Sequence, residues 1–317
     1  MSIKKRRVFP ESVHHIYQRT KKGFLIFYSV KDCLVYFTLF STLARRQGVQ
    51  VLGLCLMPDH IHIMIKPASS RQLSLFIKDV TGQFVKAFNQ ASGKTGSLFD
   101  SQFGSAPKTK AKKVRENIAY LYNNPVEKEL CSKAEEYRWN FLAYAGSRNP
   151  FSEKIRLRLA SQKMRRAVRE VNDCARKNQA LGYMRLDRLF DTLDKKEKAQ
   201  LLDYIISTYN VIDYPATIGF YGSHQKMLTA IHSNTGSEHD LREVWDAQSD
   251  RVYAKMSRIV EKEGVFRNIS GITALPVEEK LAWFRRIQRE TAASPRQIAK
   301  FLHMEMREEI PWHLTQW

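Results

Sequence analysis

Cysteine is scarce in this sequence, and its positions form no pattern. The 317-residue chain has four cysteines, Cys33, Cys55, Cys131 and Cys174, with no C-x-x-C pair among them. Such spacing excludes a disulfide framework and a zinc knuckle, and it favours a reducing compartment. The sequence also lacks an uninterrupted apolar run of the roughly 18 to 20 residues that span a bilayer. No apolar segment follows the basic start, as a signal peptide would require. We therefore expect a cytoplasmic protein without a membrane segment.

Acidic residues are too few to balance the basic ones. The chain has 52 Lys and Arg against 32 Asp and Glu, which gives a formal charge of +20. A surface of this charge attracts polyanions, and nucleic acid is the commonest polyanionic partner. We expect a nucleic-acid-binding protein that is nucleoid-associated in the cytoplasm. Charge alone leaves open a generally basic protein with no such role.

Strand and helix patterns alternate in the first half of the chain. Strands are predicted over residues 13–19, with a short extension over 25–28, and over 49–57 and 61–66 as a hairpin, with a further short strand within 98–103. Helices are predicted over residues 31–47, 73–89 and 112–123, the last one stopping before Pro125. This order predicts an α+β domain with an antiparallel sheet and helices on one face, over residues 1–150.

Helical spacing dominates the second half of the chain, so an all-α C-terminal region is expected. Residues 151–225 form a basic helical region, and residues 226–317 form a helical domain. Within the latter, a helix over 277–291 is followed by SPRQIAKFL from Ser294, with an N-cap serine and a proline at the first helical position. The pair resembles the start of a helix-turn-helix DNA-binding domain of replication initiators. An ordinary α-hairpin is the alternative.

Two histidines one residue apart carry the first chemical signal. Alternate residues of a strand face the same side, so His60 and His62 project together while Ile61, Ile63 and Ile65 face the core. Imidazole is a frequent metal ligand, and the pair therefore makes half of a metal site. Two histidines on a solvated face are the alternative that this pattern leaves open.

A tyrosine and an asparagine lie one helical turn apart before Pro125. Tyr120 and Asn124 share a helix face, so a phenol and an amide oxygen are available beside the histidines. A phenol, with a pKa of about 10, needs a nearby cation or base to act as a nucleophile. A metal would also offset charge that develops on an attacked phosphate. Tyr122 competes for this role but lies about 200° around the helix, and Asn124 favours Tyr120. Ordinary helix aromatics are the alternative.

Three motifs, in this order, resemble the HUH single-strand nucleases and, among them, the REP-associated tyrosine transposases. They are MPDHIHIM over residues 57–64, GSLFDSQF over 96–103 and YLYNNPV over 120–126. The resemblance covers roughly residues 10–145, a little under half of the chain. Glu129 stands where the family usually has glycine, and the C-terminal extension is longer than in compact members, which puts substrate and regulation in doubt.

The resemblance implies a ferredoxin-like HUH fold and a strand-transfer chemistry. His60 and His62 would bind Mg²⁺ or Mn²⁺, Asn124 would complete the ligand set, and Tyr120 would attack DNA. The products would be a 5′-phosphotyrosine link and a free 3′-OH. The link keeps the energy of the phosphodiester, so a second strand end can reverse the step without ATP. The implied substrate is a single-stranded DNA hairpin with a short flanking tetranucleotide. A homodimer, with the active site in cis or in trans, stays open.

An enzyme of this class needs cations along the DNA backbone and aromatic faces for bases. The expected nucleic-acid-binding residues are Arg6, Arg7, Arg19, Lys108, Lys110, Lys112, Lys113 and Arg115. In the first strand, His15 shares one face with Tyr17, and His14 lies on the other face, so one of the two histidines is expected to be packed.

Two other functions stay open from the sequence. One is a non-catalytic nucleic-acid-binding regulator that retains the HUH fold, against which the intact His60, His62, Tyr120 and Asn124 argue. The other is an RNA-binding protein that uses the same sheet.

Overall fold

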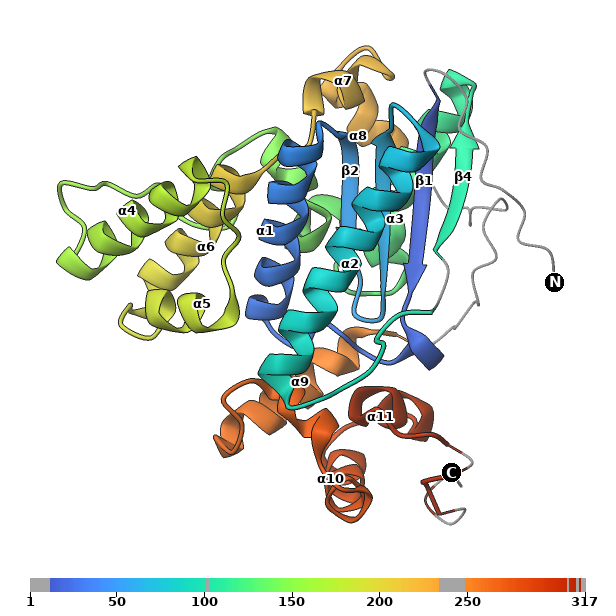
Figure 1. Ribbon diagram of the computed structural model, residues 1–317, viewed down its shortest axis with the longest axis vertical. Coiled ribbons are helices and arrows are strands. Elements are labelled where there is room, and N and C mark those ends of the chain that lie inside the picture. The colour runs from blue at the N-terminus through green and yellow to red at the C-terminus, as the bar shows by residue number, and fades with distance from the viewer. Residues whose placement is uncertain (1–11, 101–102, 234–248, 307, 312–313, 315–317) are drawn as a thin grey trace.

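A four-stranded antiparallel sheet forms the centre of the first half of the chain (Figure 1). The computed structural model describes residues 12–100, 103–233, 249–306, 308–311 and 314. The strands are β1 (Val13–Arg19), β2 (Gln50–Leu56), β3 (His60–Lys66) and β4 (Gly104–Lys108). Their order in the sheet is β2-β3-β1-β4, and β1 pairs with both β3 and β4.

Helices α1 (Val30–Gln47) and α2 (Ser70–Ser92) cover one face of the sheet. Ser29 caps α1 in a capping box with Asp32, and Gly48 ends it in the left-handed region with φ of 63°. The apolar residues of β1 and β3 that face these helices, Ile16 among them, are fully buried. The order of strands and helices is the ferredoxin-like arrangement, which confirms the predicted α+β class.

Helix α3 (Ala111–Glu127) lies on the opposite face of the sheet. It runs two residues beyond Pro125, which corrects the predicted end before the proline. Proline costs little here because it stands in the last turn, where one missing amide hydrogen bond is easily replaced. The amide of Lys128 donates to Asn124 at 3.1 Å, and that of Leu130 donates to Pro125 at 2.9 Å. Asn124 therefore stays in helical register with Tyr120.

The fourth strand lies later in the chain than predicted. It is formed by residues 104–108 and not within 98–103, of which residues 101–102 lie outside the described residues. Pro107 is tolerated because β4 is an edge strand that, within the described part of the chain, pairs only with β1. Residues 25–28 are also not a strand: the amides of Ile26 and Phe27 donate to the carbonyl of Pro58, at 2.9 and 3.3 Å.

The second half of the chain is helical, as predicted. Its α-helices are α4 (Gln162–Arg176), α5 (Tyr183–Phe190), α6 (Lys195–Tyr209), α7 (Tyr214–Gly219), α8 (His224–His232), α9 (Arg251–Glu263), α10 (Val277–Glu290) and α11 (Pro295–Leu302). Short 3₁₀ helices are η1 (Lys21–Gly23), η2 (Ala134–Glu136), η3 (Arg138–Asn140), η4 (Leu142–Ala145) and η5 (Ile269–Ala274). Among the described residues, every helix is too short or too polar to cross a bilayer.

The C-terminal helices pack on three sides of the sheet domain (Figure 1). Helices α5 and α6 contact α1, α8 contacts α3, and η5 contacts α2 near α9 and α11. One cluster of buried hydrophobic residues continues from the sheet to α11. The domain boundaries at residues 150 and 225, and the helix-turn-helix role of α10 and α11, stay predictions.

Candidate functional site

The side chains expected to carry chemistry meet on the sheet face that α3 covers. His62 of β3 lies opposite Tyr17 of β1, and the two rings are 5.2 Å apart. The His60 ring is 5.0 Å from that of His62, and the Tyr120 ring stands perpendicular to His62 at 5.5 Å. All come from one chain. The structure therefore brings together the histidine pair and the tyrosine that were predicted from separate motifs.

Asn124 joins the tyrosine to the histidines. Its amide nitrogen donates to the phenolic oxygen of Tyr120 at 3.1 Å and to Nε2 of His62 at 3.3 Å. Its carbonyl oxygen Oδ1 is buried and has no hydrogen-bond partner in the described part of the chain. A buried, unpartnered amide oxygen costs free energy unless something else binds it.

His15 and Asn117 orient the His62 ring through hydrogen bonds to its Nδ1 side. Asn117 donates from Nδ2 to the carbonyl of Lys113 at 2.9 Å, so its Oδ1 is an acceptor and lies 3.0 Å from Nδ1 of His15. His15 then carries its proton on Nδ1, and its Nε2 accepts from Nδ1 of His62 at 3.1 Å. In the neutral forms of both rings, this chain leaves the Nε2 lone pair of His62 directed at Asn124.

His60 is oriented by a carboxylate. Its Nδ1 donates to Oδ1 of Asp59 at 2.6 Å, so the lone pair that could bind a metal is on Nε2. The other carboxylate oxygen, Oδ2, is 3.8 Å from Nζ of Lys300 in α11. Burial alone would raise the pKa of Asp59, but the hydrogen bond from His60 and the nearby positive charges of Lys300 and Arg19 hold it below its usual range.

Burial and neighbouring charge set the protonation of the central residues. Burial, followed by the charges of His60 and His15, lowers the pKa of His62 well below its usual value, so this ring is neutral at pH 7. Burial raises the pKa of Tyr122 well above 10. Tyr122 packs in the hydrophobic cluster beneath α3, away from the histidines. This placement agrees with the preference for Tyr120 over Tyr122.

The donor atoms fit a divalent metal only if the asparagine takes part. Among the described residues, no group of three or more His, Cys, Asp or Glu side chains is arranged to hold a metal. His60 Nε2, His62 Nε2 and the unpartnered oxygen of Asn124 are two nitrogens and one oxygen, a set that suits Mn²⁺ and accommodates Mg²⁺ with water. The predicted ligand set is therefore chemically suitable, and the metal itself stays a proposal.

The predicted DNA-contacting cations fall into different environments. Lys110, Lys112 and Lys113 are exposed beside the start of α3, and the two last ones pair with Glu116 at 4.0 and 3.0 Å. Lys108 is 3% exposed, which corrects its expected place on the surface. Four predicted residues remain, and of these Arg19 is half-buried at the end of β1. Arg115 is half-buried and donates to a backbone carbonyl at 3.5 Å, whereas Arg6 and Arg7 lie outside the described residues.

The fold and the group formed by His60, His62 and Tyr120 together define a class of protein. It is a ferredoxin-like domain with two histidines and a helix-borne tyrosine on one face of the sheet. The comparisons give a family match for part of the chain. Residues 11–124 match the family model described as "Transposase IS200 like". The resemblance predicted from the motifs is confirmed over this part, which is a little over a third of the chain.

Two solved structures show a distant likeness. One is a REP-associated tyrosine transposase bound to a REP hairpin, with 15% identity, a TM-score of 0.37, and coverage of 44% of this chain and 81% of the other. The second is a protein from Deinococcus radiodurans R1 assigned as a transposase, with 16% identity, a TM-score of 0.26, and coverage of 36% and 93%. Both TM-scores are below 0.5, so the family match rests on the sequence model. A comparison with curated proteins finds no match.

Sequence reasoning missed three residues that orient the histidines. The sequence alone leaves the role of His15 open, although its shared strand face with Tyr17 is a usable signal. Asn117 stands three residues before Tyr120 and seven before Asn124, the spacing of one helix face. Lys300 had no local signal, because only the packing of α11 against the sheet domain places it near Asp59.

Proposed function

We propose that this chain is a metal-dependent single-stranded DNA transposase and endonuclease that cleaves and rejoins hairpin-containing DNA through a 5′-phosphotyrosine intermediate. The observation that carries the proposal is the convergence of Tyr120, His62 and Asn124 within hydrogen-bond and ring-contact distance on one sheet face. The family match over residues 11–124 supports the transposase class. A basic chain of formal charge +20 supports DNA as the substrate.

The chemistry of the step follows from the positions of the side chains. Tyr120 attacks a phosphodiester phosphorus, the bond from phosphorus to the 3′ oxygen breaks, and the released oxygen takes up a proton in place of the one that the phenol loses. Asn124 donates a hydrogen bond to the phenolic oxygen and orients it. Mg²⁺ or Mn²⁺, held by His60, His62 and Asn124, would supply charge neutralisation at the phosphate. Attack by the 3′ oxygen of another strand end on the tyrosine-linked phosphate reverses the step and joins the ends.

A labelled hairpin substrate tests the proposal. The protein is incubated with single-stranded hairpin DNA and Mg²⁺ or Mn²⁺ and then denatured, and a DNA adduct of the protein is measured on a gel. We expect an adduct with the wild type and none with Tyr120→Phe. Tyr122→Phe is the matched control: it also removes a phenolic oxygen from α3, one with no hydrogen-bond partner in the described residues.

The same assay separates the alternative function. Tight hairpin binding by the wild type without any adduct, in the presence of either metal, would support a non-catalytic nucleic-acid-binding regulator. An adduct that persists in Tyr120→Phe and disappears in Tyr122→Phe would assign the nucleophile to the other tyrosine.

A further inference from the structure

We propose that the C-terminal segment supports the catalytic centre, because Lys300 of α11 positions Asp59 and, through it, the His60 ring. Lys300 lies far outside the part of the chain that matches the transposase family. The inference rests on the proposed function in taking His60 as a metal ligand. In it, Lys300 is a positioning residue that does not itself contact DNA or metal.

Helix α11 is held firmly against the sheet domain. Seven of its eight residues are buried. The carbonyl of Lys300 accepts from the amide of Leu25 at 3.3 Å, and the carbonyl of Phe301 accepts from the phenol of Tyr28 at 2.6 Å. His303, which ends the helix, donates from Nε2 to the carbonyl of Leu25 at 2.6 Å. These bonds fix the backbone of α11 relative to the segment that follows β1.

The side chain of Lys300 lies near the carboxylate of Asp59, which also accepts a hydrogen bond from His60. Its Nζ is 3.8 Å from Oδ2 of Asp59, whose Oδ1 is 2.6 Å from Nδ1 of His60. The side chains of Lys300 and Asp59 are only 10% and 15% exposed. Each carboxylate oxygen therefore has its own partner, and rotation of the carboxylate would break both contacts in a poorly solvated place.

The backbone leaves room for this arrangement. A β-carbon at residue 23 would lie 3.4 Å from Cε of Lys300 and 3.6 Å from Oδ2 of Asp59. Residue 23 is glycine with φ of +71°, a conformation that other residues rarely adopt. Arg19, a predicted DNA-binding residue, approaches the same point at 3.3 Å. The N-terminal strand, the turn before β3 and α11 thus meet beside His60.

Mn²⁺ affinity tests the proposal. If Lys300 positions His60, its removal should weaken Mn²⁺ binding, whereas its positive charge alone predicts that removal should tighten it. Removal of a positive charge near a cation site would by itself tighten Mn²⁺ binding. Loss of positioning would weaken it, since outer partners of a ligand histidine typically contribute roughly 10- to 100-fold to affinity. For Lys300→Met we expect binding weakened by about 3- to 10-fold, measured by electron paramagnetic resonance, with Lys300→Arg close to the wild type. Lys280→Met is the matched control: it removes another buried lysine from the C-terminal region.

A metal-free readout accompanies the affinity. Nitrogen-15 chemical shifts of the His60 ring report whether its proton stays on Nδ1, and we expect averaging between tautomers in Lys300→Met only. Unchanged shifts together with unchanged or tighter Mn²⁺ binding in Lys300→Met would overturn the inference. Lys300→Gln, which keeps more polarity at this position, replaces the methionine variant if that protein does not fold. A wild type without a Tyr120 adduct would count against the proposed function and leave these two measurements to decide on Lys300.

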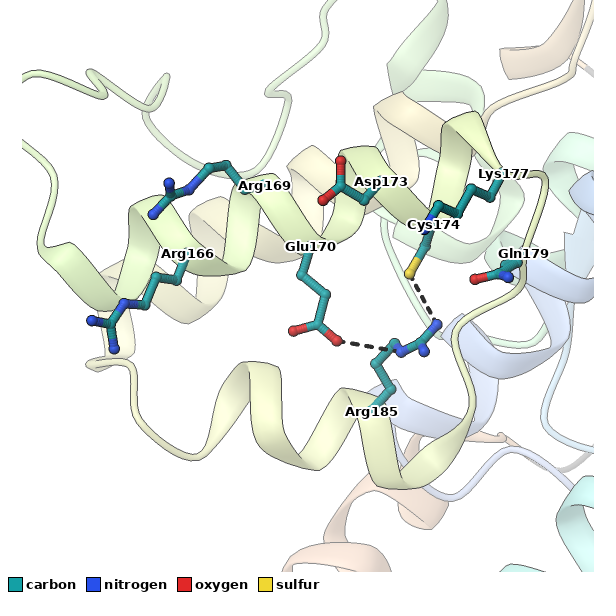
Figure 2. A pocket seen from close by; sticks show the side chains of 8 residues that line it. All are labelled: Arg166, Arg169, Glu170, Asp173, Cys174, Lys177, Gln179 and Arg185. Atoms are coloured by element: carbon teal, nitrogen blue, oxygen red, sulfur yellow. Dashed lines mark hydrogen bonds and ion pairs between the residues drawn. The ribbon is translucent and has the colours of Figure 1, made fainter.

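A separate surface lies between α4 and α5. An open cavity of about 430 Å³ lies here. Figure 2 shows the side chains that line it, most of the charged ones basic. The residues that line it are Arg166, Arg169, Glu170, Asp173, Cys174, Lys177, Gln179 and Arg185. Both carboxylates are already paired: Glu170 with Arg185 at 3.3 Å, and Asp173 with Arg176.

Three cations of this surface keep their charge uncompensated. Arg166, Arg169 and Lys177 have no carboxylate within ion-pair distance in the described part of the chain. In Figure 2 the first two point away from the Glu170–Arg185 pair. The opposite face of α4 is buried against the core. The helix is therefore held in place by its buried face, while its exposed face carries the positive charge. We infer that the surface formed by Arg166, Arg169 and Lys177 binds the phosphate backbone of DNA outside the catalytic site.

Salt dependence of DNA binding tests this surface. Each phosphate contact with duplex DNA contributes about −0.9 to the slope of log K against log salt concentration. For the triple change R166Q/R169Q/K177Q we expect the slope for a hairpin stem to become less negative by roughly 2 to 3. The matched control, K255Q/R258Q/K262Q, removes three exposed cations from α9. An equal change in both triples, or none in the first, would refute the inference, and adduct formation at low salt shows separately whether catalysis is intact.

Discussion

His15→Phe is the most informative single change, because it keeps an aromatic ring in the core and removes both ring nitrogens. His15 is fully buried and joins Asn117 to His62 by hydrogen bonds of 3.0 and 3.1 Å. Without it, Nδ1 of His62 loses its acceptor, and the 3.3 Å hydrogen bond from Asn124 to Nε2 is left to hold the proton on Nδ1. The lone pair that faces Asn124 would then be available only part of the time.

The expected magnitudes follow from these two bonds. Two buried polar groups lose their partners, each at a cost of about 1 to 3 kcal/mol in the free energy of unfolding. Loss of an outer partner of a ligand histidine weakens metal binding by roughly 10- to 100-fold. We expect the rate of adduct formation at limiting Mn²⁺ to fall by a similar factor.

His14→Phe separates catalysis from stability. His14 is the preceding residue of β1, is also buried, and also makes two hydrogen bonds, to Ser12 at 3.2 Å and to Ser105 at 3.0 Å. It faces the other side of the sheet. Both variants should lose stability in urea, but only His15→Phe should lose Mn²⁺ affinity and single-turnover adduct formation. Equal rates in the two variants would refute the role assigned to His15.

Three further predictions concern stability and the second tyrosine. Asp203→Ala should lower the free energy of unfolding in urea by about 3 to 5 kcal/mol, because the fully buried carboxylate partners Arg138; a loss below 1 kcal/mol would contradict this. Tyr122→Phe should unfold at the same urea concentration as the wild type or higher, since its buried hydroxyl has no partner in the described residues; a clear loss would reveal one. Burial and the charge of Lys94 lower the pKa of His303 well below 6.5. The unfolded chain therefore binds more protons as pH falls through 6.5, and stability should decline between about pH 7 and 5. The decline should be shallower in His303→Gln, and parallel curves would contradict the assignment.

Local pattern alone placed much of the candidate site. Period-two alternation put His60 and His62 on one face of a strand, and four-residue spacing put Tyr120 and Asn124 on one face of a helix. The helix over residues 31–47 followed from its apolar spacing and its end at Gly48, and it is observed at residues 30–47. These features depend only on neighbours within a few residues, which periodicity describes well.

Two predictions were wrong because the surroundings of a segment outweighed its local secondary-structure propensity. Pro125 was expected to end α3, but in the last turn a proline removes too little hydrogen bonding to do so. Residues 25–28 look like a strand in composition, yet they bond to Pro58 and to α11 and find no strand partner. In both cases the surroundings outweighed a weak propensity.

By itself the sequence determined which side chains of each element point the same way, and its motifs identified the family of residues 11–124. Only the tertiary structure decided which elements are neighbours. It set β1 beside β3, so that His15 supports His62, and it returned α11 to the sheet, so that Lys300 meets Asp59. The physical reason is that periodicity gives a side chain's direction relative to its own element, whereas contacts between distant segments depend on the packing of the whole core and the closure of long loops.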